Sequence, residues 1–91
     1  MAATPNGLST AQVPVGTTAT QILPARPDRR EVTIINHGTT DVMIGGTNVQ
    51  TTTGALLAGV KGASITLRST VAIFGIVGDG EQVVSFVETF S

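Results

Sequence analysis

The chain has 91 residues, and Asp, Glu, Lys and Arg make up only 12% of it, about half the share of an average soluble domain. Its net charge is −1, it has no Cys, Trp or Tyr, and His37 is its one histidine, so composition excludes a zinc site, a disulfide framework and a basic nucleic-acid surface. A small domain with so few charges predicts a structural or interaction protein that is covered by partners, and we expect no nucleic-acid partner.

The chain is predicted to divide into an extended N-terminal arm over residues 1–14 and a single domain over residues 15–91. Small and polar residues dominate the arm, and its two prolines disfavour a helix or a regular strand. Two interpretations remain open for it. It is a frayed terminus, or it orders on the sheet edge of a neighbouring subunit with Leu8 and Val13 as pocket-filling contacts. In the second case, removal of residues 1–14 leaves a folded module that no longer docks.

Neither the first residues nor the longest apolar run indicates secretion or membrane insertion. The first residues carry no basic side chain and no long apolar run, so we expect no signal peptide. The longest apolar run, over 71–77, is too short to span a bilayer. We therefore expect a protein that is made in the cytosol and has no membrane partner.

The first half of the domain alternates between short strands and turns. β-branched residues over 17–23 predict a strand, and 30–36 has the strongest strand pattern of this half. A polar loop then leads into a returning strand at 41–45. The stretch 30–45 is therefore predicted to form a β-hairpin.

The second half continues in the same way. A brief apolar strand at 55–60 precedes a strand at 63–68 in which apolar and polar residues alternate. The run 71–77 is apolar on both faces, which predicts a central strand covered on both sides. The Gly-Asp-Gly turn at 78–80 predicts a hairpin into the last strand, 82–90.

Seven to eight short strands without a helical period predict an all-β fold, a small antiparallel β-sandwich or barrel. The last strand has Val83 and Val87 on one face and Val84, Phe86 and Phe90 on the other. One face fills the core, and the other needs a cover from a further strand layer or another subunit. Phe90 is a core residue or an intersubunit contact. The predicted partner contacts are Leu8, Val13, Val15 and Phe90.

No group of residues points to catalysis. His37 is predicted to be a turn residue, because no Ser or Thr of the chain lies in a nucleophile-elbow motif. The acidic residues lack the spacing of a calcium loop, and the glycine pairs do not precede a helix with a phosphate-binding Lys. We expect no catalytic residue, no metal, no cofactor and no enzymatic activity.

The basic residues Arg26, Arg29 and Arg30 form one cluster, with Asp28 and Glu31 among them. Two interpretations remain open for it. The cluster binds an acidic partner, or, as we favour, it pairs locally with these two acids at the entrance of a strand. Exposed pairs of this kind contribute well under ~1 kcal/mol each.

Six segments carry a pattern that extends over about residues 15–90. They are Thr17-Thr-Ala-Thr-Gln-Ile-Leu-Pro24, Arg29-Arg-Glu-Val-Thr-Ile-Ile-Asn36, Asp41-Val-Met-Ile-Gly-Gly46, Thr53-Gly-Ala-Leu-Leu57, Ala72-Ile-Phe-Gly75 and the Val-rich strand from Val83 to Glu88. Together they resemble a small β-rich module of tailed-bacteriophage virion proteins. Related modules occur in capsid decoration proteins, head fibres and tail components.

This resemblance implies a virion structural protein that is made in the host cytoplasm and ends up on the capsid surface. The expected role is that of a capsid decoration (cement) protein, which binds the assembled head at subunit junctions and stabilises it. The expected partners are the major capsid protein and further copies of the chain in a homotrimer. The alternatives are a tail or fibre module that binds a host-surface receptor, and a tail-tube or connector subunit.

Overall fold

Eight β-strands make up the chain in a computed structural model, which describes residues 7–91. The strands are rich in Val, Ile and Thr, and most of the connections between them contain Gly, Pro or Asp. In chain order they are β1 (Gly7–Val15), β2 (Thr20–Leu23), β3 (Arg29–Asn36), β4 (Val42–Gly45), β5 (Ala55–Leu57), β6 (Ser64–Leu67), β7 (Ile73–Ile76) and β8 (Gln82–Phe90).

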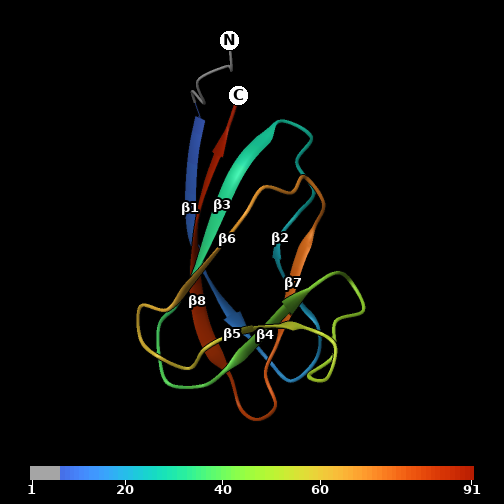
Figure 1. Cartoon of the computed structure of the whole chain (residues 1–91), viewed down its shortest axis with the longest axis vertical. Coiled ribbons are helices and arrows are strands. Elements are labelled where there is room, and N and C mark those ends of the chain that lie inside the picture. The colour runs from blue at the N-terminus through green and yellow to red at the C-terminus, as the bar shows by residue number, and fades with distance from the viewer. Residues whose placement is uncertain (1–6) are drawn as a thin grey trace.

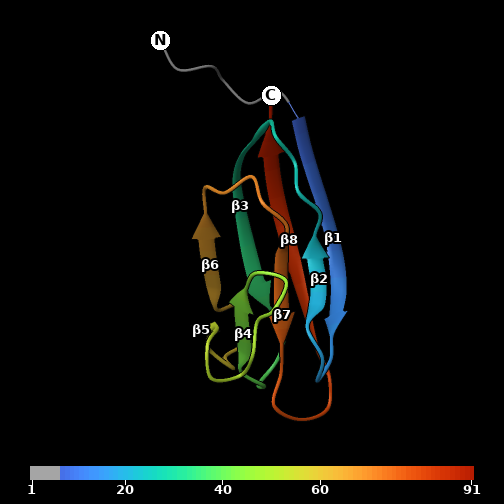
Figure 2. The same cartoon turned by 90° about the vertical axis from the view of Figure 1, so that its right-hand side faces the viewer.

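The strands form two four-stranded sheets that pack face to face (Figure 1). One sheet has the order β1-β8-β3-β6 and the other β2-β7-β4-β5, and every neighbouring pair is antiparallel. In Figure 2 the second sheet lies in front of the first, with β5 and β6 on one side and β1 and β2 on the other. The prediction of an all-β antiparallel sandwich is confirmed.

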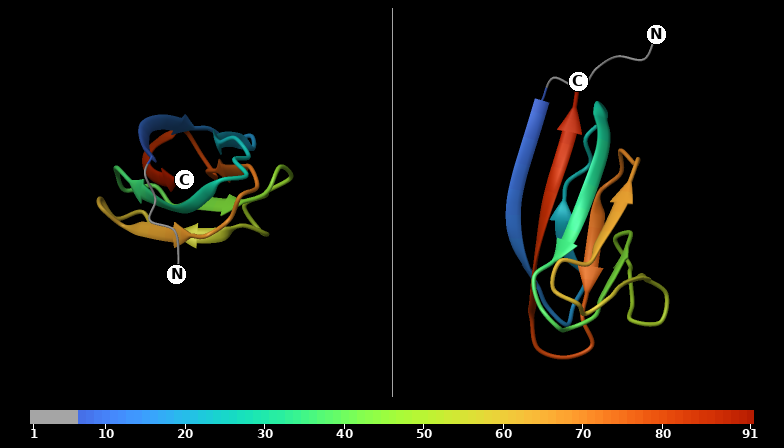
Figure 3. Two further views of the ribbon diagram at one scale, coloured as in Figure 1. Left: turned by 90° about the horizontal axis from the view of Figure 1, so that it is seen from above. Right: turned by 60° about the vertical axis from the view of Figure 1, so that its left-hand side comes forward.

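Both predicted hairpins are wrong. β3 and β4 lie in different sheets, and so do β7 and β8, which means that the two turns carry the chain across the sandwich (Figure 3). Gly80 has a φ of +69°, as a tight turn allows for glycine. The residues of a turn favour a reversal of the chain, but they do not specify which sheet the next strand joins. In the described chain, β4 and β5 are the consecutive strands that pair directly.

The core lies between the sheets and consists of inward-facing aliphatic residues and one Phe. The alternation predicted for the last strand is confirmed, since Val84 and Phe86 are buried while Val87 is exposed. β7 lies between β2 and β4, as predicted for a central strand, although Phe74 on its outer side is only half-buried. The core residues are Val15, Ile22, Leu23, Val32, Ile34, Val42, Ile44, Leu57, Ile73, Val77, Val84 and Phe86.

Asn36 fixes the point at which the chain leaves β3 for the other sheet. Its side chain is fully buried, and its Nδ2 donates to the carbonyl oxygens of Thr40 at 2.9 Å and Ala58 at 3.1 Å. Its Oδ1 accepts a hydrogen bond from the amide of Gly38 at 3.0 Å. One side chain therefore holds both the turn after β3 and the connection after β5.

Most of the predicted arm belongs to the sheet. Residues 7–14 lie in β1, which pairs with β8 from Gly7↔Phe90 to Val15↔Gln82. A boundary after residue 14 therefore falls inside a strand, and removal of residues 1–14 would strip β8 of one neighbour instead of leaving an intact module. Residues 1–6 of the predicted arm lie outside the described residues.

Candidate interaction surface

The four residues predicted to contact a partner lie in different environments. Leu8 is 68% exposed, whereas Val15 is fully buried in the core and Val13 packs partly buried against it. Phe90 is half-buried, with the Arg26 guanidinium carbon 3.9 Å from the centre of its ring. Successive residues of a strand point to opposite faces, so the odd-numbered residues of β1 point inward. Leu8 is the member of this set that the sheet presents to a partner, and such a contact stays a prediction.

One large surface is formed by the side chains of the β1-β8-β3-β6 sheet that point away from the other sheet. We call this surface the outer face. Alternation and burial along each strand give its members as Leu8, Thr10, Gln12 and Pro14 of β1, Val83, Ser85, Val87 and Thr89 of β8, Glu31, Thr33 and Ile35 of β3, and Ser64 and Thr66 of β6. Glu31 is the one charged side chain among them, and it pairs with Arg68, which directly follows β6; the exposed Arg30 lies at the bulge of β3 next to Glu31.

Hydroxyl and apolar side chains lie side by side in rows across the outer face. The strand register places Thr10 beside Val87, Val87 beside Thr33, and Thr33 beside Thr66. The hydroxyl oxygens of Thr33 and Thr66 are 2.9 Å apart and share a hydrogen bond. The buried centre of a protein interface is depleted of charged residues, and this face has that composition without any cover from residues 7–91.

His37 and Ser85 form a hydrogen-bonded pair at the edge of this face. The His37 Nε2 lies 2.8 Å from the Ser85 Oγ, which is within the reach that a base and a nucleophile require. The hydrogen bonds found within residues 7–91 give His37 no carboxylate partner to orient its ring, and Ser85 lies in the middle of a strand. The His37 amide also donates to the Val83 carbonyl at 3.1 Å, so the pair fastens the turn after β3 to β8.

An apolar groove opens on the side where β5 and β6 end their sheets. It has a volume of about 250 Å³ and lies between the two layers. Ile65 and Leu67, the inward-facing residues of β6, line it and remain half-buried. The other lining residues are Ile44, Gly45, Gly46, Ala55, Ser69, Val71, Ala72 and Ile73.

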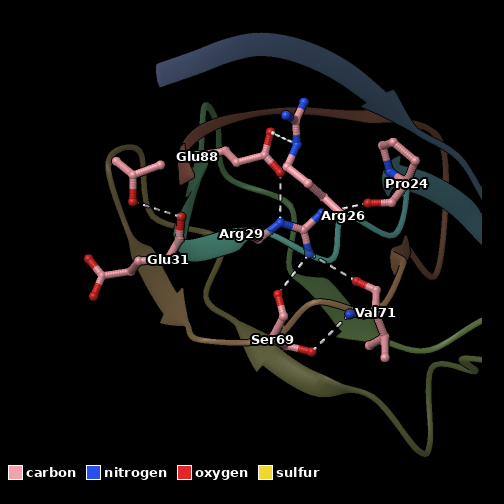
Figure 4. Close-up of polar contacts among 8 residues, drawn as sticks. Pro24, Arg26, Arg29, Glu31, Ser69, Val71 and Glu88 are labelled. Atoms are coloured by element: carbon pink, nitrogen blue, oxygen red, sulfur yellow. Dashed lines mark hydrogen bonds and ion pairs between the residues drawn. The ribbon is translucent and has the colours of Figure 1, made fainter. Parts of the chain in front are cut away.

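A buried ion pair closes one end of the sandwich (Figure 4). Arg29 is 5% exposed and Glu88 3%, and the Arg29 Nε donates to the Glu88 Oε2 at 2.7 Å. The Arg29 Nη1 donates to the carbonyls of Ser69 at 2.8 Å and Val71 at 3.0 Å, and its Nη2 donates to the Pro24 carbonyl. One guanidinium therefore ties together β3, β8, the end of β2 and the connection between β6 and β7.

The local pairing predicted for the arginine cluster is wrong. Arg29 pairs with Glu88, and so does Arg26 at 3.3 Å, while Glu31 pairs with Arg68 at 3.3 Å across an exposed surface. The partners come from distant parts of the sequence because β8 and β6 flank β3. A signal for the buried pair was present: Glu88 continues the inward-facing positions of its strand, where an acid requires a buried partner.

The structure offers no metal cluster within residues 7–91, because nowhere do three or more acidic or His side chains come together there. The same part of the chain holds no helix with the length and apolar character needed to cross a bilayer.

Comparison with known proteins gives a shared fold and no sequence family. No protein-family model matches the chain, and no curated protein matches its sequence. The crystal structure of the stem and receptor binding domain of the spike protein P1 from bacteriophage PM2 matches 88% of this chain with a TM-score of 0.60 and 20% identity. The match spans 32% of that spike structure, and at this identity it shows the fold alone.

A second solved structure matches less well. It belongs to Bacillus endospore appendages, which are described as disulfide-linked pili. It aligns with 100% of this chain and 98% of its own at 19% identity, with a TM-score of 0.43. That score is too low to support an inference about fold or function.

Proposed function

We propose that this chain is a structural protein of a bacteriophage virion, and that it decorates the capsid by binding the assembled head where capsid subunits meet. The observation that carries this proposal is the outer face, which is uncovered by residues 7–91 and whose charged side chains Glu31 and Arg68 pair with each other at one end of it. Such a surface is suited to burial against a partner, here the major capsid protein.

The rest of the molecule supports a mechanical role. The ion pair of Arg29 at one end of β3 and the amide of Asn36 at the other hold the connecting loops, so the sheet presents its outer face on a stiff support. Each copy needs to bind only weakly, because copies joined in a homotrimer bind a repetitive shell with a high effective concentration. The proposed location is therefore the capsid surface of the virion.

A second function is favoured by one specific observation. The solved structure that shares this sandwich fold contains the stem and receptor binding domain of a phage spike. On that basis the chain is a spike or fibre module, and its outer face contacts either a neighbouring spike segment or a receptor on the host surface. The two functions are distinguished by what the protein binds: a decoration protein binds heads, and a receptor-binding spike or fibre module binds host cells.

Replacement of Val87 by Lys is expected to weaken binding to heads by about tenfold or more, because a charge at the centre of the outer face must lose its water on docking. The measurement is co-sedimentation of the purified protein with undecorated heads of the phage that encodes this chain. Leu56→Lys is the matched control, since Leu56 is an exposed apolar residue on β5 of the opposite sheet.

Thermal melting of both variants serves as a control and verifies that each of them folds. Equal binding of the wild type and both variants to heads would remove the outer face from the docking contact. Binding of the wild type to host cells, with no binding to heads, would replace decoration with the spike or fibre function.

A further inference from the structure

Two strand edges of the β1-β8-β3-β6 sheet have no neighbouring strand within residues 7–91. β1 and β6 end the sheet on opposite sides, as the right-hand view of Figure 3 shows. Proteins usually guard such edges with charged side chains, proline or bulges, because the free backbone groups pair with other chains. Neither β1 nor β6 contains a charged residue, and Pro14 is the single proline of the two strands.

The backbone groups that β1 leaves free follow from Pro14. Pro14 lies opposite Val83, whose carbonyl accepts from the His37 amide on the β3 side and so points away from β1. Pro14 and Val83 are therefore a pair without mutual hydrogen bonds, and the groups of Pro14 point outward. Alternation along the strand then leaves the amides and carbonyls of Leu8, Thr10 and Gln12 free at the edge.

The same reasoning applies to β6. Asn36 donates its amide to the Ala63 carbonyl at 2.8 Å and accepts from the Gly62 amide at 2.8 Å, so the even-numbered residues of β3 direct their backbone groups toward β6. Their partners Ile65 and Leu67 are therefore bonded within the sheet. The backbone groups that point outward from β6 are those of Ser64 and Thr66.

The two edges are complementary in strand direction and in the face of the sheet to which their side chains point. A sheet of four antiparallel strands has edge strands that run in opposite directions, so a second copy placed beside the first in the same orientation continues the antiparallel ladder. Thr10 of one copy then lies opposite Thr66 of the next, with both side chains on the outer face. Ala11 comes to lie beside Ile65, at the rim of the apolar groove.

We propose that copies of this chain join head to tail, with β1 of one copy paired to β6 of the next in a continuous sheet. The contact involves two different surfaces, so it generates a closed ring or an open filament. This inference rests on the homotrimer of the proposed function and deepens it, because a ring of three copies buries every free edge of this sheet. It also joins the outer faces of the copies into one continuous surface.

Disulfide trapping tests the contact directly, because the chain has no Cys of its own. Thr10→Cys and Thr66→Cys are made as separate proteins, mixed and oxidised. Strand pairing brings their Cα atoms to about 5.5 Å, within disulfide range, so the mixture is expected to give a covalent heterodimer. Thr52→Cys in an exposed loop replaces Thr66→Cys in the control, and is expected to give none. Cross-linking of Thr10→Cys with itself, but not with Thr66→Cys, would overturn the head-to-tail contact in favour of two-fold pairing of β1.

A pair of proline variants tests the backbone edge itself. Thr10→Pro removes an amide that points outward, as Pro14 already does, and is expected to reduce the mass in light scattering to that of a monomer while the chain stays folded. Ala11→Pro removes an amide that bonds to β8, and is expected to lower the melting temperature. A monomeric wild type, or an oligomer whose mass Thr10→Pro leaves unchanged, would overturn the proposal.

The outcomes also separate this contact from the decoration function. Cross-linked copies that do not bind heads would support the edge contact and contradict decoration. If the wild type binds heads but the Thr10→Cys and Thr66→Cys proteins do not cross-link, decoration is supported and the edge contact is overturned.

Discussion

Replacement of Glu88 by Gln is expected to lower the free energy of unfolding by about 3–5 kcal/mol, because it leaves the buried Arg29 guanidinium without its counter-charge. A surface location would allow water to replace the carboxylate, but the Arg29 side chain is enclosed between the sheets. The measurement is urea unfolding followed by circular dichroism, with the slope of the transition compared to verify two-state behaviour.

Glu31→Gln is the matched control for this experiment. Glu31 makes the same kind of ion pair with Arg68, but both side chains are largely exposed, so the expected loss is under ~1 kcal/mol. Equal losses in the two variants would show that burial of the Glu88 pair contributes nothing to stability.

The double variant Arg29→Met with Glu88→Leu separates the charge from the hydrogen bonds. A simple buried ion pair is replaced by apolar residues with little loss of stability. Arg29 also donates to the carbonyls of Pro24, Ser69 and Val71, which the double variant leaves without these donors. We therefore expect the double variant to remain less stable than the wild type, and full recovery would contradict the role of Arg29 as a clamp on the loops.

Replacement of Asn36 by Ala is expected to cost at least about 2 kcal/mol, because the Thr40 and Ala58 carbonyls and the Gly38 amide all lose a buried partner. The same urea titration measures this loss. Asn48→Ala removes the same amide from an exposed position, and is expected to change stability by no more than ~0.5 kcal/mol. A loss for Asn36→Ala as small as that of the control would show that the loops after β3 and β5 hold without the clamp.

Local patterns in the sequence were sufficient to predict the strands and the faces of several of them. The alternation in 82–90 correctly separates Val84 and Phe86 from Val83 and Val87, because a strand in a sheet that packs on one side has one buried face and one exposed face. The assignment of strands to sheets was not predictable in this way. It depends on contacts such as Arg29 with Glu88, which lie 59 residues apart in sequence.

The strand β1 was not predictable from the sequence for a different reason. Pro14 in the sequence argues against a regular strand, yet it lies in the ladder opposite Val83. An edge strand tolerates proline where the missing amide would point away from its neighbour. Only the position of β1 at the edge reveals this. Alternation along the strand then places Val13 and Val15 inward while Leu8 stays on the surface.

The path of the chain between the sheets has a consequence for how the molecule folds. Every connection except the one from β4 to β5 crosses from one sheet to the other, so neither sheet is built from a continuous stretch of sequence. Strand pairing must therefore bring together distant segments, which places folding in the slow range of about milliseconds to seconds. It also means that one sheet cannot detach while the other survives. The module is expected to unfold in a single cooperative step.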